Sequence, residues 1–120
     1  LSYPFTTNFN ISHGHAVGIT FNEFLKFNYK NIKNTVTKFD LKSRFDILFK
    51  LSNTKNIFDL DNYFKKLKKE AGIKDSFLDF KINIKKNLKR ITKDINFQRL
   101  SNNPVKIKLQ DINKILLNKN

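Results

Sequence analysis

The sequence contains no cysteine and no methionine, and it has only two prolines and three glycines among 120 residues. Without cysteine, the chain has no disulfide, no thiolate nucleophile and no cysteine ligand for zinc or an iron–sulfur cluster. No apolar run reaches the roughly 18–20 residues that a membrane span requires, and no signal segment opens the chain. We therefore expect a cytoplasmic protein without a membrane partner.

Acidic residues are also scarce, because 10 Asp and Glu stand against 24 Lys and Arg, for a formal net charge of +14. Such a charge ordinarily indicates nucleic acid as a partner, since cations neutralise phosphates and release counterions. Nearly all of these cations are lysines, however, whereas proteins that read bases rely on the forked guanidinium of arginine. We therefore expect no nucleic-acid partner, and we interpret the lysine runs as solvent-exposed helix faces.

Apolar residues recur with the period of an α-helix, and the sustained alternation that is typical of strands is absent. An apolar stripe that includes Val17 and Phe21 follows Ser12, a good N-cap residue, and predicts a helix over residues 13–28. Gly72 is typical of the residue that ends a helix. Further helices are predicted near residues 41–49, 57–71, 77–80, 84–95 and 109–116. The expectation is one all-α domain over residues 1–120, a bundle of five or six helices without a significant sheet.

Both histidines lie in the segment ISHGHAVG, where a loop is expected to lead into the first predicted helix. Residues two apart on a helix point about 200° away from each other, so His13 and His15 are not expected to share a metal ion. We expect His15 to be structural or solvent-facing. The chain has no Gly-x-Ser-x-Gly elbow and no glycine-rich phosphate loop. On its residues alone, it contains no complete active site.

Two segments resemble the iron-containing alcohol dehydrogenase family. Residues 2–28, SYPFTTNFNISHGHAVGITFNEFLKFN, are similar to the family's metal-binding segment, with His13 in place and Ser12 where proline is usual. Residues 99–118, RLSNNPVKIKLQDINKILLN, resemble the family's closing Asn-Pro-Arg segment and terminal helix, with Val105 where arginine is common. The resemblance covers nearly the whole chain, and it places the chain in the C-terminal part of the family's all-helical domain.

This resemblance implies an enzyme that transfers hydride between NAD(P) and an alcohol or aldehyde at an Fe²⁺ or Zn²⁺ ion. The family binds the metal through one Asp and three His, and His13 corresponds to the last of these ligands. In the family's spacing, the preceding ligand falls two positions before Leu1. We therefore expect a C-terminal fragment of a two-domain dehydrogenase, which alone binds no metal or NAD(P) and catalyses no reaction. Relatives are often dimers, so a homodimer is a further expectation.

The same resemblance implies substrate-binding roles for Tyr3 and Arg99. Tyr3 lies where many relatives place a His near the nicotinamide, whereas Arg99 lies four residues before Asn103, at a position that faces the substrate cavity in relatives. A guanidinium suits a carboxylate, phosphate or phosphonate, and the combined motifs are similar to the branch that reduces phosphonoacetaldehyde. The structural alternative for Arg99 is an exposed cation at a helix end.

Two other interpretations stay open at this point. One is a small basic helical module that binds nucleic acid without catalysis, which steeply salt-dependent binding to duplex DNA would reveal. The other is a gene that encodes only this remnant, as a folded protein without activity. The residues encoded before Leu1 would separate both from the dehydrogenase.

Overall fold

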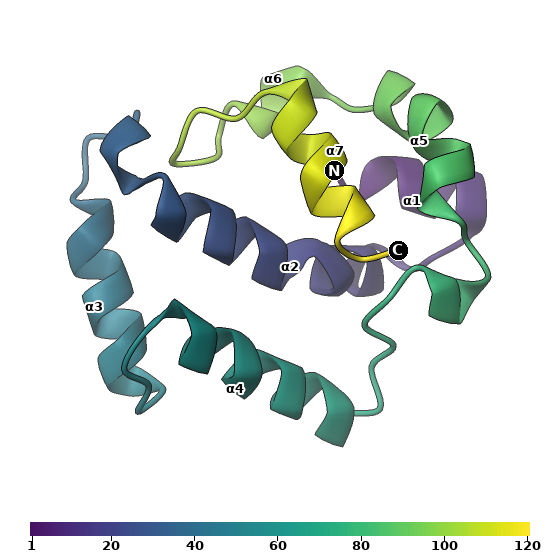
Figure 1. Ribbon diagram of the computed structural model, residues 1–120. Helices are drawn as coiled ribbons and strands as arrows, with labels where there is room; N and C mark the ends of the chain where they lie inside the picture. Colours follow the sequence, from purple (N-terminus) through teal and green to yellow (C-terminus); the bar gives the residue numbers. More distant parts are fainter.

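The computed structural model describes residues 1–120, and every regular element in it is helical (Figure 1). The only strand-like pairing is an isolated antiparallel bridge between Thr35 and Val105. The prediction of an all-α fold without a sheet is therefore confirmed. No helix combines the length and the apolar character that crossing a membrane demands. The elements are α1 (Tyr3–Phe9), α2 (His13–Lys30), η1 (Ile32–Asn34), α3 (Leu41–Leu51), α4 (Ile57–Glu70), η2 (Leu78–Phe80), α5 (Ile84–Lys93), α6 (Phe97–Leu100) and α7 (Leu109–Leu117).

The structure has seven α-helices instead of the five or six predicted, and α1 is one that apolar periodicity did not reveal. The residues before Ser12 were expected to form a loop. Pro4 lies in the first turn of α1, where its missing N–H leaves no hydrogen bond unmade. Asn10 ends the helix in the left-handed conformation, with φ of 53°. This helix is short, and its position depends on packing against α2 and α5.

The predicted helix over residues 84–95 is present, but it ends two residues earlier. α5 ends at Lys93, and the four-residue helix α6 follows after a short turn. Asn96 begins α6, because its side-chain oxygen accepts a hydrogen bond from the backbone N–H of Arg99 at 2.9 Å. The short helix expected near residues 77–80 is the 3-10 turn η2. α6 is thus the second helix that apolar periodicity did not reveal.

The N-terminal boundary of α2 agrees with the prediction, although the buried face of the helix does not. Ser12 occupies the N-cap position, but its side chain makes no capping hydrogen bond. Ala16 and Ile19 are fully buried, whereas Val17 and Phe21 of the predicted apolar stripe are 42% and 39% exposed. The latter two side chains line a surface groove instead.

α4 ends as its sequence predicts. Gly72 has a φ of 67°, its N–H donates to the carbonyl of Lys69, and the next N–H, of Ile73, donates to the carbonyl of Lys68 at 2.8 Å. These bonds form a Schellman motif, in which glycine adopts the left-handed conformation without a Cβ clash. Gly72 therefore stops the helix at the predicted place.

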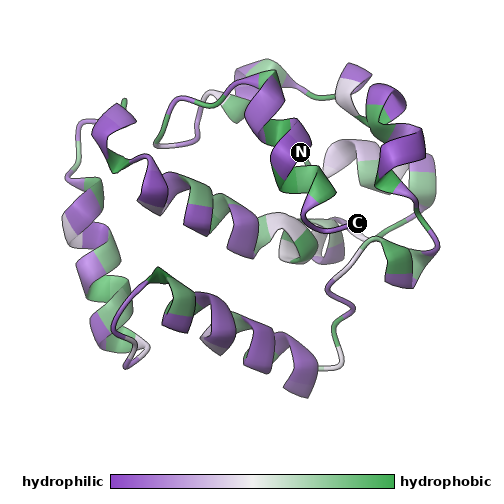
Figure 2. Ribbon diagram, viewed as in Figure 1, coloured by the Kyte–Doolittle hydropathy of each residue, from purple (hydrophilic) through white to green (hydrophobic).

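α2 runs through the middle of the molecule and packs against α1, α4 and α7, whereas α5 packs against α7 and α1 (Figure 1). Hydrophilic residues cover most of the outer surface of α4 (Figure 2). The buried apolar residues form two clusters. The large cluster contains Phe5, Ile11, Ala16, Ile19, Phe77, Ile82, Ile84, Ile91, Ile95, Leu100, Ile112 and Leu116, and the small cluster contains Leu41, Phe45, Ile57, Leu60 and Val105.

Candidate active-site cavity

His13 is the first residue of α2, and its ring is exposed at the point where the chain leaves α1. Its Nδ1 lies 3.2 Å from the hydroxyl oxygen of Ser2. In the tautomer in which Nδ1–H donates to Ser2, Nε2 keeps its lone pair for another partner. In that tautomer, Ser2 orients the ring and Nε2 is the nitrogen that is left for a ligand.

A cavity of about 660 Å³ brings together all three residues for which the sequence predicts a role, namely Tyr3, His13 and Arg99. They come from three different helices, α1, α2 and α6. All three side chains are exposed, so they can be reached from solvent. The other residues that line the cavity are Leu1, Ser2, Pro4, Lys93, Asp94, Ile95 and Asn96.

One wall of this cavity is the turn between α5 and α6, which is tied to α1 by side-chain hydrogen bonds. The amide nitrogen of Asn8 donates to Asp94 at 2.9 Å. The amide oxygen of Asn8 in turn accepts a hydrogen bond from Arg90 at 3.1 Å. Asn8 thus joins α1 to the end of α5, and the Asp94 carboxylate is engaged by that amide.

The cavity is electropositive, because Lys93 and Arg99 outnumber its single carboxylate, Asp94. None of the seven ion pairs in the structure involves Lys93 or Arg99. The pKa of the Leu1 amino group, which also lines the cavity, is lowered by burial and by the positive charge of Arg99. The guanidinium of Arg99 is therefore close enough to influence charge inside the cavity.

His15 lies in different surroundings from His13. Its Nε2 is 2.9 Å from the carbonyl oxygen of Lys74, and its ring packs edge-on against Phe80 at a centroid distance of 4.8 Å. The two histidines therefore serve different parts of the molecule, in agreement with the helical geometry. His15 holds the connection after α4 against α2, which is a structural role.

The family resemblance assigns a single metal ligand to this chain, His13. No group of three or more His, Cys, Asp and Glu side chains that could hold a metal ion gathers in the structure. His13 lines the cavity and supplies at most one donor nitrogen to a metal ion, whereas catalytic zinc sites use about three protein ligands. The residues fit a single donor, so we derive no reaction step through a metal held by this chain alone.

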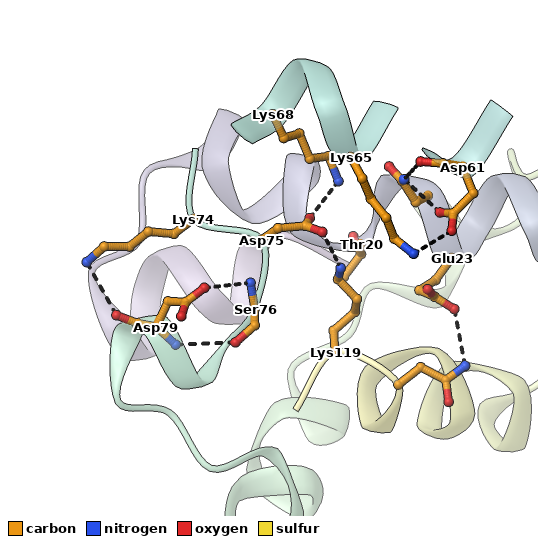
Figure 3. A network of polar contacts seen from close by, with 12 residues as sticks. Thr20, Glu23, Asp61, Lys65, Lys68, Lys74, Asp75, Ser76, Asp79 and Lys119 are labelled. Carbon is orange, nitrogen blue, oxygen red and sulfur yellow. Dashed lines mark hydrogen bonds and ion pairs between the residues drawn. The ribbon is translucent and has the colours of Figure 1, made fainter. Parts of the chain in front are cut away.

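The structure contains a buried ionic network that the sequence analysis did not predict (Figure 3). Asp75 accepts hydrogen bonds from the ammonium groups of Lys68 and Lys119, each at 2.7 Å. Both lysines are buried, so the interpretation of the lysine runs as wholly exposed is wrong for Lys68. Lys68 lies four residues after Phe64 and eight after Leu60, on the face of α4 that packs inward. This spacing could have indicated from the sequence that Lys68 is buried.

A second part of the network joins α2 to α4. Asp61 is buried, which by itself raises its pKa, but hydrogen bonds from Lys65 and Asn22 and the charge of Lys26 outweigh burial and hold the pKa below its usual value. The distances to the Asp61 carboxylate are 2.6 Å from Lys65 and 2.8 Å from Asn22 (Figure 3). Asp61 is therefore ionised at neutral pH and binds the two helices together.

Comparison with known proteins agrees with the resemblance seen in the sequence. The profile of the Fe-containing alcohol dehydrogenase family, C-terminal domain, matches residues 1–119. The chain belongs to this family. No curated protein and no solved structure matches it significantly.

Family membership makes this chain part of an alcohol dehydrogenase, which favours the enzymatic interpretation over the nucleic-acid-binding module. The match extends over both segments that carry the resemblance, the one around His13 and the one around Asn103-Pro104. It concerns the family as a whole, so the phosphonoacetaldehyde branch stays a prediction. The residue roles are likewise predictions that the cavity geometry makes testable.

Proposed function

We propose that this chain is the C-terminal helical domain of a metal-dependent dehydrogenase that transfers hydride between NAD(P) and an alcohol or aldehyde. In this proposal, His13 supplies one ligand to an Fe²⁺ or Zn²⁺ ion. The observation that carries the proposal is the shared cavity of Tyr3, His13 and Arg99 in a chain of this family. The remaining ligands and the nucleotide-binding domain would belong to a longer polypeptide, so the chain alone would bind no metal and have no activity.

The role of His13 follows from its position at the cavity wall. The contact with Ser2 selects the ring orientation, as hydrogen-bond partners commonly do for metal-binding imidazoles. A divalent ion, when bound, would polarise the substrate oxygen and stabilise negative charge there. The part that this chain plays is to hold the imidazole at the entrance of α2, facing the space in which the substrate would bind.

Tyr3 and Arg99 would bind the substrate from the other walls. The hydroxyl of Tyr3 has no hydrogen-bond partner in the structure, so it is free to donate to a substrate oxygen. Arg99 offers a planar fork of donors that matches an anionic group. An aldehyde that carries a phosphonate, such as phosphonoacetaldehyde, meets both requirements, and we propose it as the substrate.

The decisive experiment compares His13→Ala with His15→Ala in the complete polypeptide to which this chain belongs. We expect His13→Ala to lose at least tenfold in bound iron or zinc and in dehydrogenase activity, because one ligand is removed. His15→Ala is the matched control, since its ring contacts Lys74 and Phe80 and not the cavity. Metal content is measured by elemental analysis of the purified proteins.

Unchanged metal content in His13→Ala would refute the proposed ligand. A Ser2→Ala variant tests the same site more gently, because it removes the contact to Nδ1 and should weaken metal binding without abolishing it.

Duplex DNA binding that falls steeply with salt would instead favour the nucleic-acid module. A homodimer is part of the proposal, and sedimentation equilibrium of the complete protein would test it.

A further inference from the structure

The cavity contains a second cation that the sequence did not assign to the site. Lys93 is the last residue of α5, and it lines the same cavity as Arg99, which lies on α6. The two residues are six positions apart in sequence, and the turn between the helices places both on one wall of the cavity. Both side chains are exposed, and neither forms an ion pair or a side-chain hydrogen bond. Their charges are therefore available to a ligand.

The rest of this wall offsets only one of the two positive charges. Its one carboxylate, Asp94, already accepts a hydrogen bond from Asn8 on α1. Asn96 uses its amide oxygen to cap α6, which leaves the N–H groups of the same amide without a partner. The wall thus offers one guanidinium, one ammonium and one amide donor, against a single carboxylate that is engaged elsewhere.

We infer that Lys93 and Arg99 together bind a dianionic phosphoryl or phosphonate group, with Asn96 donating a further hydrogen bond. The inference rests on the proposed function and specifies its substrate class. Two separate cations fit a tetrahedral group with two charges and three oxygens, whereas a carboxylate is satisfied by the arginine fork alone. Lys93 is then the residue that selects a dianion over a monoanion.

The test titrates the chain with methylphosphonate and, separately, with acetate, followed by backbone amide NMR shifts around residues 93–99. We expect methylphosphonate to bind at least tenfold more tightly than acetate at pH 8. Lys93→Gln and Arg99→Gln should each weaken methylphosphonate binding about tenfold, since each removes one charged hydrogen-bond donor.

Lys89→Gln is the matched control, because Lys89 lies on the same helix, is exposed and does not line the cavity. It carries the same change in net charge, and its affinity for methylphosphonate should stay within twofold of the parent. The Leu1 amino group is common to all variants and cancels from the differences. Equal losses in Lys89→Gln and Lys93→Gln, or equal affinities for methylphosphonate and acetate, would overturn the inference.

The phosphoryl group could come from the substrate or from the ribose phosphate of NADP, and a third titration with 2′-AMP separates these sources. Methylphosphonate binding that 2′-AMP does not exceed supports the substrate. Binding of 2′-AMP at least tenfold tighter, and lost in Lys93→Gln, would overturn the substrate assignment. None of these titrations needs bound metal or enzyme activity. A negative titration would therefore contradict only the anion site, whereas unchanged metal content in His13→Ala would contradict the proposed function.

Discussion

Positively charged side chains on the two sides of α2 differ in whether acidic residues form ion pairs with them. Toward α4 and the C-terminus, buried or half-buried carboxylates neutralise the cations, and the resulting ion pairs join Glu23, Asp61 and Asp75 to the lysines around them. Toward the cavity, Lys93 and Arg99 have no such partner. In a chain with only 10 acidic residues against 24 basic ones, three carboxylates pair with lysines at this interface, whereas the cavity is lined by one carboxylate, Asp94. The cavity is left positive, which is the condition for binding an anion.

The forces that hold these two sides also differ. The helices around the cavity rest on the large apolar cluster, where the rings of Phe5 and Phe77 stack at a centroid distance of 4.3 Å. The α2–α4 side combines the small apolar cluster with charged hydrogen bonds. We therefore expect the cavity side to be insensitive to pH and salt, and the α4 side to depend on both.

The largest expected effect is that of Phe77→Ala on the cavity side. Phe77 is fully buried, and its backbone N–H donates to the carbonyl of Lys119, so the residue also anchors the C-terminus. Loss of the ring should lower the free energy of unfolding by about 3–5 kcal/mol, equally at low and high salt. Urea denaturation measures this loss. A loss below about 1 kcal/mol would show that the large cluster does not stabilise the helices around the cavity.

An intermediate effect is expected for Asp75→Asn on the α4 side. The change leaves the ammonium groups of Lys68 and Lys119 buried without a charged acceptor, which should cost about 2–3 kcal/mol because Asp75 itself is partly exposed. Asp46→Asn breaks the exposed pair with Lys42 and is the matched control, with a much smaller expected loss because water screens this pair. Equal losses in the two variants, measured by urea denaturation, would remove the distinction between buried and exposed pairs.

A smaller effect than that of Asp75→Asn is expected for Asp61→Asn, and it should depend on pH. The pKa of Asp61 is lower in the folded protein than in the unfolded chain, so its stabilisation is present above the unfolded value, about 3.9. It is lost as pH falls through the lower folded value. Asp61→Asn should therefore cost about 1–2 kcal/mol at pH 7, as for a charged hydrogen bond, and progressively less as the pH falls from about 4 to about 2. A difference that is independent of pH between these limits would contradict the role of the ionised carboxylate.

Much of the local structure could be predicted from the sequence, because it depends on residues close together in the chain. α2 begins at His13, directly after its N-cap residue, and α4 ends before Gly72, which adopts the left-handed conformation. The separation of His13 from His15 follows from the angle between successive residues of a helix. The family was also recognisable, because the residues around His13 and around Asn103-Pro104 carry its pattern.

The sequence by itself determined that the chain is helical, strongly basic and a member of the dehydrogenase family, since periodicity, composition and motifs are properties of neighbouring residues. Only the tertiary structure decided that Lys68 is buried, that α1 forms, and that Lys93 joins Tyr3, His13 and Arg99 at one cavity. The physical reason is that these outcomes depend on contacts between segments far apart in the chain, such as Asn8 with Asp94, which helical periodicity does not specify.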